Sequence, residues 1–415
     1  MTIPRTNAEK LDQADELAAF RDRFVLDDED RIYADGNSLG RLPRDTAARL
    51  EALVSAWGDR LVTGWQEWIE LPATTGDLLG RVLGAQPDEV LVCDSTTVNL
   101  YKLAHAALDH RPGAIATDTA NFPTDRYVLE GLAAQRGVEL HLFESDDPAG
   151  PSAADVARVC AKGHVTLVCL SHVAYRSGGL ADMVEITEAA SEAGALVLWD
   201  LSHSAGAVPV GLGAAGVELA VGCTYKYLNA GPGAPGFLYV RRELQPQLRS
   251  PIQGWFGQRD QFAMGPQYEP EEGIARFHAG TPPILGLVSV EAGVELVLEA
   301  GISMIRRKSE QLTDLTIALA DERLTQLGFS VASPRDRRVR GGHVALAHPE
   351  SWRVCRALIE HAHVVPDFRP PDLVRLGFSP LYSRFIDVWD AVDRLAGLVE
   401  RSEHEDMDAT PLRVT

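Results

Sequence analysis

A carboxylate, an imidazole and an amine stand at the ends of two apolar segments near the middle of the chain. The segment ALVLWD ends on Asp200, His203 follows three residues later, and LAVGCT leads into Tyr225 and Lys226 before a glycine-rich turn. A lysine amine can form a Schiff base, a carboxylate can pair with a pyridine nitrogen, and an imidazole can lie over a flat ring. Pyridoxal phosphate (PLP) requires this set of groups, so the pattern favours a PLP site.

Each of these groups also has a structural role open to it. A lysine at a strand end can extend its amine to solvent, Asp200 can bind a helix or loop amide, and a lone histidine often serves only as a hydrogen-bonding residue. A Schiff-base lysine must also be partly desolvated or lie near other cations to act as a nucleophile at pH 7. The apolar segment before Lys226 and its tyrosine neighbours fit that requirement.

A hydroxyl-rich loop supplies a second candidate site. In CDSTTVNLYK an apolar strand ends and Ser95, Thr96 and Thr97 precede a predicted helix. Hydroxyls and free amides at a helix N-terminus bind anions, here the cofactor phosphate, although a plain helix cap is the alternative. The chain has no GxxxxGK, which excludes a nucleotide P-loop, and no GxGxxG between a strand and a helix.

Two further segments hold candidate ligands. NFPTDRY combines the aromatic ring of Phe122 with a proline turn and Asp125, and it can line a cofactor or form an ordinary turn. The apolar segment DLVRLGF holds Arg375. An arginine fork binds a carboxylate in bidentate fashion, so Arg375 binds either a substrate carboxylate or an internal acidic residue.

The elements that must position these residues alternate between strand and helix. Between residues 89 and 240, short and nearly all-apolar strands are separated by helical patterns, which predicts an α/β fold with a mostly parallel central sheet covered by helices. Ligands bind at the carboxyl ends of such strands. An amphipathic helix is expected over 7–24, and a helical pattern over 284–323 breaks at Gly301. We divide the chain into an N-terminal segment packing with the small domain (1–60), a large PLP-binding domain (61–283) and a smaller C-terminal α/β domain (284–415).

Composition excludes several classes of function. The net charge of −20 argues against nucleic acid and anionic membranes as partners. No signal peptide or transmembrane run is recognisable, and five scattered cysteines fit a reduced, cytoplasmic location. The twelve histidines show no metal-binding spacing, so no metal is expected. The basic run RDRRVRGGH (335–343) is interpreted as a solvated loop.

Together these strings resemble the fold-type I PLP-dependent enzymes and, more narrowly, the kynureninase family. The resemblance rests on YADGNSLG, CDSTTVNLYK, NFPTD, SHVAYRSG, WDLSHSAGAVPV, GCTYKYLNAGPGAP, GWFG, GTPPIL, RGGHV and PDFRPPDLVRLGFSPLY, in the family's order from residue 33 to about 382. It implies hydrolysis of L-kynurenine to anthranilate and L-alanine by Cβ–Cγ cleavage, in a homodimer with shared active sites. Tryptophan catabolism, NAD biosynthesis and anthranilate supply for secondary metabolism all remain open as pathways.

The resemblance also implies a role for each matching residue. Lys226 would hold PLP and act as a base, Asp200 would pair with the pyridine nitrogen, and Tyr225 would take part in protonation. Arg375 would bind the substrate α-carboxylate, while Trp255 and Thr281 would reach the phosphate in the neighbouring subunit. The remaining expected cofactor contacts are the phosphate-binding Thr96, Thr97 and Tyr225, and the lining residues Phe122, Pro123, Thr124, Asp125, Ser171 and His203.

The substrate and the reaction are less closely defined than the cofactor. Ala174 stands where a polar residue is expected and Ala279 where proline is more usual, so the choice between L-kynurenine and its 3-hydroxy derivative is not fixed. A cysteine desulfurase would need a nucleophilic cysteine, and Cys355 lies within a predicted helix. The same fold also serves aminotransferases, decarboxylases and non-catalytic proteins, and these functions stay open as well.

Overall fold

The computed structural model describes residues 3–26, 28, 30–145 and 148–410, and its larger unit is built on a seven-stranded sheet. The strand order is β2-β8-β7-β6-β5-β3-β4. The strands are β2 (Val90–Val92), β3 (Ala114–Asp118), β4 (Leu140–Phe143), β5 (Val165–Ser171), β6 (Leu196–Asp200), β7 (Leu219–Gly222) and β8 (Phe237–Val240).

Neighbouring strands from β4 to β7 run parallel, whereas β8 is antiparallel to both β7 and β2. The reversal follows from the connection, because residues 223–236 join β7 to β8 directly and without a crossover helix. The predicted mostly parallel sheet is confirmed, and the loop that holds Lys226 is the connection that turns the chain back.

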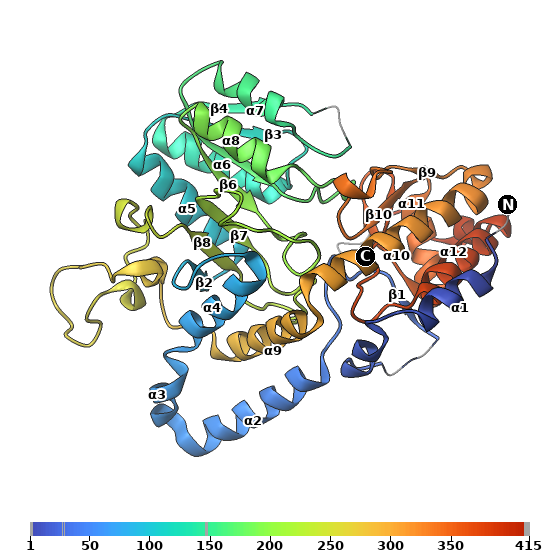
Figure 1. The fold of residues 1–415 in the computed structure, drawn as a ribbon, viewed down its shortest axis with the longest axis horizontal. Helices are drawn as coiled ribbons and strands as arrows, with labels where there is room; N and C mark the ends of the chain where they lie inside the picture. Colours follow the sequence, from blue (N-terminus) through green and yellow to red (C-terminus); the bar gives the residue numbers. More distant parts are fainter. Residues whose placement is uncertain (1–2, 27, 29, 146–147, 411–415) are drawn as a thin grey trace.

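Helices cover both faces of this sheet (Figure 1). Along β6, Val197 and Trp199 belong to one apolar cluster, while Leu196 and Leu198 belong to the opposite one. This alternation is why the buried strands have almost continuous apolar sequences. The first cluster includes residues of α4 (Leu71–Leu83), α7 (Ala153–Cys160), α8 (Met183–Glu192) and α9 (Ile284–Ala300), and the second those of α5 (Thr96–His110) and α6 (Pro123–Arg136).

A smaller four-stranded antiparallel sheet, ordered β12-β13-β10-β9, forms the second unit. The predicted break at Gly301 is confirmed, where φ is +79° between α9 and α10. The helix α9 follows the predicted domain boundary at residue 283, yet it contributes Leu287 and Val290 to the core of the larger unit. The position of the boundary therefore stays a prediction. The elements here are β9 (Ser330–Val331), β10 (Val344–Ala347), β12 (Asp367–Arg369), β13 (Leu373–Leu376), α10 (Ile302–Arg323), α11 (Ser351–His361) and α12 (Phe385–Glu400).

The predicted helix over residues 7–24 is wrong in its extent. The structure has a short helix, α1 (Arg5–Gln13), followed by a turn and the 3₁₀ helix η1 (Ala18–Arg23). The Asp15 carboxylate accepts a hydrogen bond from the Leu17 amide at 3.0 Å and lies 2.7 Å from the Lys308 ammonium. A side chain that bonds its local backbone competes with helix continuation, so the apolar spacing alone overestimated the helix.

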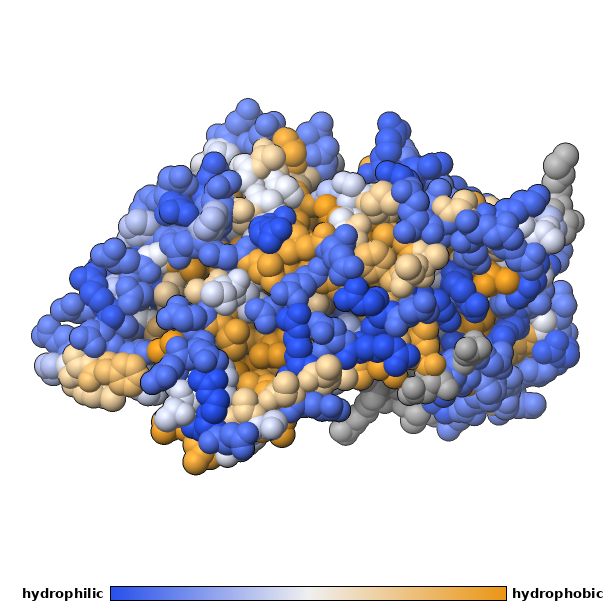
Figure 2. All heavy atoms as spheres, turned by 60° about the horizontal axis from the view of Figure 1, so that its bottom comes forward, coloured by the Kyte–Doolittle hydropathy of each residue, from blue (hydrophilic) through white to orange (hydrophobic). Residues whose placement is uncertain are grey.

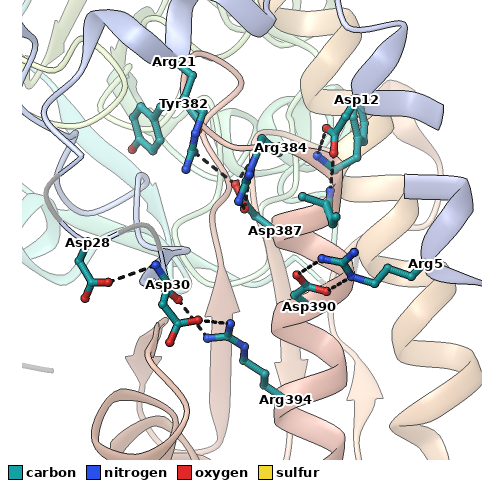
Figure 3. Close-up of polar contacts among 12 residues, drawn as sticks. Arg5, Asp12, Arg21, Asp28, Asp30, Tyr382, Arg384, Asp387, Asp390 and Arg394 are labelled. Atoms are coloured by element: carbon teal, nitrogen blue, oxygen red, sulfur yellow. Dashed lines mark hydrogen bonds and ion pairs between the residues drawn. The ribbon is translucent and has the colours of Figure 1, made fainter. Parts of the chain in front are cut away.

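The N-terminal segment docks on the smaller unit through polar contacts (Figure 3). Both oxygens of Asp12 accept amides at the start of α12, from Phe385 at 2.6 Å and Ile386 at 3.0 Å. Arg5 pairs with both carboxylate oxygens of Asp390, at 2.7 and 2.8 Å. The strand β1 (Ile32–Tyr33) then pairs in parallel with β11 (Val364–Val365).

The chain then passes to the larger unit, where the long helix α2 (Arg44–Arg60) lies along α9 (Figure 1). None of the helices among the described residues is long and apolar enough to cross a membrane. The remaining short elements are α3 (Trp65–Trp68), η2 (Leu61–Gly64), η3 (Gln245–Gln247), η4 (Trp255–Gly257), η5 (Gly273–Phe277), η6 (Thr325–Leu327), η7 (Arg337–Val339) and η8 (Glu403–Asp406).

Candidate active site

Lys226 and His203 meet beyond the carboxyl ends of two neighbouring strands, β6 and β7. The Lys226 Nζ lies 2.9 Å from the His203 Nε2. Burial and the nearby Lys226 charge lower the pKa of His203 well below its usual value, so its imidazole is neutral and accepts from the ammonium. Lys226 itself is half-buried, which keeps its amine accessible from the site.

Two buried carboxylates lie next to this lysine. Asp200 ends β6 and accepts the Ser202 amide at 2.8 Å. Burial and the Asp200 charge raise the pKa of Asp125 well above its usual value, an effect that Lys226 opposes. The Asp125 Oδ2 is buried and has no hydrogen-bond partner among the described residues. A pair of adjacent carboxyl groups with an open acceptor suits a cationic N–H group between them.

Tyr225 lies beside the lysine with its phenol protonated at neutral pH. Its ring centroid is 5.9 Å from the Lys226 Nζ. The neighbouring Cys223 and burial both raise the pKa of Tyr225 above its usual value. A neutral phenol of this kind can donate a hydrogen bond or deliver a proton.

The hydroxyl-rich loop begins α5 as expected. The Ser95 hydroxyl accepts the Val98 amide at 3.3 Å, so Ser95 is the helix cap and Thr96 and Thr97 form the first turn. A Cβ atom added to Gly236 would lie 2.9 Å from the Thr96 nitrogen. The backbone just before β8 therefore presses closely on this turn, whose amides point away from the helix and can bind an anion.

A hydrogen bond to Asn121 joins Ser171 to the NFPTD segment. The sequence pattern alone did not single out Asn121 as a candidate residue. The Asn121 Oδ1 accepts from the Ser171 hydroxyl at 2.6 Å and from the Phe122 amide at 2.9 Å. A cavity of about 200 Å³ is lined by Asn121, Ser171 and Ala174 among others. Phe122 is partly exposed and packs edge-on against Tyr175, with centroids 5.2 Å apart. The position of Asn121 at the start of NFPTD was the sequence feature that could have identified it as a site residue.

Arg375 is fully buried and bound by protein groups. It faces Asp367 across the β12–β13 pair and forms an ion pair with it. Its guanidinium also donates to the Tyr175 carbonyl and to the Ser38 hydroxyl, the latter at 3.3 Å. The sequence left two alternatives for Arg375, a substrate carboxylate or an internal acidic residue, and the structure contains the internal salt bridge.

The segment from Asp35 to Gly40 joins this arginine to the lysine loop. The Gly40 amide donates to the Tyr225 carbonyl at 2.8 Å. Burial and the neighbouring Asp367 charge raise the pKa of Asp35 to about 7, while Ser38 and Arg375 act in the opposite direction. These contacts come from pairing between distant segments, and no local pattern in YADGNSLG indicates them.

His343 corrects the interpretation of the basic run as a solvated loop. Residues 335–339 are exposed, but Arg340 and His343 are fully buried. The His343 ring lies 5.6 Å from the His203 ring, centroid to centroid. Burial, together with Arg375 and Lys226, lowers the pKa of His343 well below its usual value. The sequence did not reveal that the chain turns inward at Arg340, because exposed arginines precede this position.

Trp255 and Thr281 lie on the exposed surface. The Trp255 indole donates to the Gln261 carbonyl at 2.8 Å and packs edge-on against Phe256 and Phe262. A Cβ atom added to Gly254 would clash with the backbone of Ala279, so GWFG and AGTPPIL lie side by side. Within one chain, these residues offer an exposed surface rather than a wall of the Lys226 site.

Comparison with solved structures identifies the class of fold. A cysteine desulfurase of Escherichia coli aligns with a TM-score of 0.79 at 17% identity, over 93% of this chain and 99% of that one. The apo cysteine desulfurase of Thermococcus onnurineus gives 0.77 at 21% identity, over 97% and 99% of the two chains. An alanine–glyoxylate aminotransferase of Nostoc gives 0.68 at 19% identity, over 90% and 96%. The chain has the fold of the fold-type I PLP-dependent enzymes.

Similar sequences show to which family within this fold class the chain belongs. Residues 305–395 match the family model of the kynureninase C-terminal domain. The kynureninase of Burkholderia mallei is 42% identical over 406 residues, which is 95% of each chain. That of Pseudomonas fluorescens is 42% identical over 408 residues, or 96% of each chain. The chain therefore belongs to the kynureninase family.

Proposed function

We propose that this protein hydrolyses L-kynurenine to anthranilate and L-alanine with PLP as its cofactor. The observation that carries the proposal is the convergence of Lys226, His203 and the buried Asp125–Asp200 pair at one sheet edge, in a chain of the kynureninase family. These groups suit a cofactor with an aldehyde, a basic ring nitrogen and a phosphate.

The residues present fit PLP. Lys226 would hold it covalently, Asp200 with Asp125 would keep the ring nitrogen protonated, and His203 would lie over the ring. Thr96, Thr97 and Tyr225 would bind the phosphate, and Phe122, Pro123, Thr124 and Ser171 would line the cofactor. The Oδ2 of Asp125 and the Nδ1 of His203 are both buried and have no hydrogen-bond partner within the described part of the chain, so a ligand would satisfy them. When bound, PLP supplies a conjugated ring that accepts electron density from the substrate's α-carbon.

The surrounding side chains hold the substrate and move its protons. Arg375 binds the α-carboxylate and so aims the Cα–H bond toward Lys226. The Lys226 amine removes this proton, while neutral His203 keeps the amine oriented without adding a second positive charge. Water attacks the γ-ketone, the Cβ–Cγ bond breaks, and the Tyr225 hydroxyl delivers a proton to Cβ. The protonated Lys226 amine returns a proton to Cα, so the products are anthranilate and L-alanine. The proton released as the new anthranilate carboxyl group ionises restores the Tyr225 hydroxyl.

A desulfurase-type reaction is the weaker candidate despite the shared fold. That chemistry requires an accessible thiolate, because the thiolate is the nucleophile. All five cysteines are buried, and burial raises the pKa of Cys355 well above its usual value. Burial likewise raises the pKa of the Cys93 thiol to about 12.

The proposed homodimer rests on a surface beside α2 and α9. Figure 2 shows apolar atoms gathered on the face that these helices form. Trp57 is 58% exposed and Val62 is 76% exposed, and such large apolar surfaces mark interaction sites. A groove of about 360 Å³ is lined by Leu53, Trp57, Trp65, Trp68, Pro283, Ile284 and Leu285. We propose that a second copy docks here, and the family resemblance implies that Trp255 and Thr281 of that copy would reach the first copy's cofactor.

One assay tests the reaction. The purified protein is loaded with PLP and given L-kynurenine, and anthranilate fluorescence and alanine are measured together. We expect both products in equal amounts, and Lys226→Ala should remove the visible absorbance of the lysine-bound cofactor together with turnover. If the loaded wild type forms no anthranilate, the proposal is wrong. Parallel reactions with 3-hydroxy-L-kynurenine would fix the substrate preference.

A mixing experiment tests the shared site. Lys226→Ala and Trp255→Ala chains are each inactive or weakly active as homodimers if Trp255 serves the neighbouring subunit. Mixed and re-associated, they should recover activity in heterodimers that hold one intact site. Absence of recovery, with heterodimers present by mass, would refute sharing. A cytoplasmic location is also part of the proposal, since five scattered cysteines without a CxxC pair fit a reducing compartment.

A further inference from the structure

A fully buried lysine lies directly beneath the hydroxyl-rich loop. The Lys102 side chain has no exposed surface. Its ammonium lies 2.7 Å from the Asp94 Oδ2, donates to the Phe277 carbonyl at 2.8 Å, and is 3.4 Å from the Cys93 sulfur. Lysine is almost never fully buried unless it is paired, so this position has a specific reason. The reaction proposed above does not use it.

The partners of Lys102 are the residues that shape the loop. Asp94 is the last residue before Ser95, and its φ of +48° lies in the left-handed region that aspartate and asparagine tolerate best. The side-chain amide of Asn99 donates to the Cys93 carbonyl at 2.7 Å, which holds the same turn from the helix side. Lys102 thus fixes the backbone conformation from which the first turn of α5 projects.

The positive charge of Lys102 also neutralises the Asp94 carboxylate. The Asp94 side chain is 26% exposed and lies one residue before the loop assigned to the phosphate. An uncompensated carboxylate at that position would repel a dianion. His278 offers no other cation, because burial and Lys102 lower its pKa to about 4. The neutralising charge for Asp94 therefore comes from Lys102.

We propose that Lys102 is a positioning residue for the cofactor phosphate, neutralising Asp94 and fixing the turn that holds Thr96 and Thr97. The inference rests on the proposed PLP function. It also links two loops, because Phe277, the second partner of Lys102, precedes the segment that contains Thr281. One buried ammonium therefore holds the phosphate loop of its own subunit and the base of the loop that would reach the neighbouring one.

The test uses opposite charge changes in the full-length protein. Lys102→Met removes the cation and should raise the dissociation constant of PLP at least about tenfold, which corresponds to about 1.4 kcal/mol. Asp94→Asn removes the anion, suits the left-handed backbone, and should leave PLP affinity unchanged or tighter. The double variant should return to within about threefold of the wild type. Affinity is measured by titrating apoprotein and following the absorbance of the lysine-bound cofactor.

Two comparisons separate electrostatics from general damage. Pyridoxal, which lacks the phosphate, should bind the wild type and Lys102→Met with nearly equal affinity. Lys308 is a matched control, since it is also buried and lies 2.7 Å from an aspartate, Asp15, but in the other unit. Lys308→Met should lower the melting temperature without changing PLP affinity.

Each outcome decides the inference. Equal loss of PLP and pyridoxal affinity in Lys102→Met, or equal weakening of PLP by Lys102→Met and Asp94→Asn, would refute it. If Lys102→Met does not fold, the milder Asp94→Asn still decides, because weaker PLP binding in that variant contradicts the charge argument. A wild type that binds no PLP would instead overturn the proposed function.

Discussion

Asp35 gives the sharpest pH-dependent prediction, because its carboxyl group is held in its protonated form beside the Asp367–Arg375 pair. Its pKa rises from 3.8 to about 7 on folding, chiefly through burial and then through Asp367. At 1.36 kcal/mol for each pKa unit, the difference of about 3 units corresponds to at most about 4 kcal/mol. The residue as a whole keeps some exposure to solvent, so we expect about 1–3 kcal/mol after solvent screening.

The sign follows from the direction of this pKa shift. Below pH 3.8 Asp35 is protonated in both the folded and the unfolded chain, and it has no effect on the pH dependence. Between about pH 4 and 7 the unfolded chain releases the proton and the folded chain keeps it, so stability falls as pH rises. Above about pH 7 the loss is complete. Asp35→Asn should therefore be more stable than the wild type by about 1–3 kcal/mol at pH 8.

Urea denaturation from pH 5 to 8 measures this difference. The variant should show a flatter dependence of unfolding free energy on pH, whereas Asp22→Asn, at an exposed position, should follow the wild type. The KM for L-kynurenine should also rise above about pH 7 in the wild type and less so in Asp35→Asn, because ionised Asp35 competes with the substrate carboxylate for Arg375. Parallel stability curves for the wild type and Asp35→Asn would refute the reasoning.

Three further variants test other parts of the site. Arg375→Met should destabilise the fold by about 3 kcal/mol because it removes the paired cation from the buried Asp367 carboxylate, and adding Asp367→Leu should restore much of the loss; urea curves that barely move would contradict this. Tyr225→Phe should lower kcat about a hundredfold and leave KM within about threefold, as steady-state kinetics would show; an unchanged kcat would exclude its proton-delivery role. Gly236→Ala should weaken PLP binding about tenfold in cofactor titrations, since its Cβ would lie 2.9 Å from the first amide of α5, whereas Gly131→Ala meets nothing within 4 Å and should bind normally.

Much of the large sheet could be predicted because its strands are short, apolar and separated by clear helical patterns. Ser171 and Asp200 are the last residues of β5 and β6, and Lys226 follows β7. Because these three strands are parallel neighbours, local patterns sufficed to predict that their ends lie at one edge of the sheet. The burial of His343 could not be predicted, because exposed arginines precede it directly and hydropathy cannot show where such a run turns inward. The contact of Arg375 with Ser38 likewise joins segments 337 positions apart, and no local spacing encodes it, whereas Asp367 lies on the neighbouring strand only eight residues away.

Asp12 and Phe385, which are 373 positions apart, have a consequence for biosynthesis. At about 5–20 residues per second, the start of α12 leaves the ribosome roughly 20–75 seconds after Asp12 does. The seven-stranded sheet can fold within that interval, whereas β1 and the Asp35–Gly40 segment must wait for the strands of the smaller unit. The contact between Arg375 and Ser38 therefore forms only after β13 (Leu373–Leu376) has been synthesised, and nascent chains that lack β13 will be catalytically silent. Slower translation of the part that encodes the smaller unit would lengthen the exposure of the N-terminal segment to chaperones and proteases.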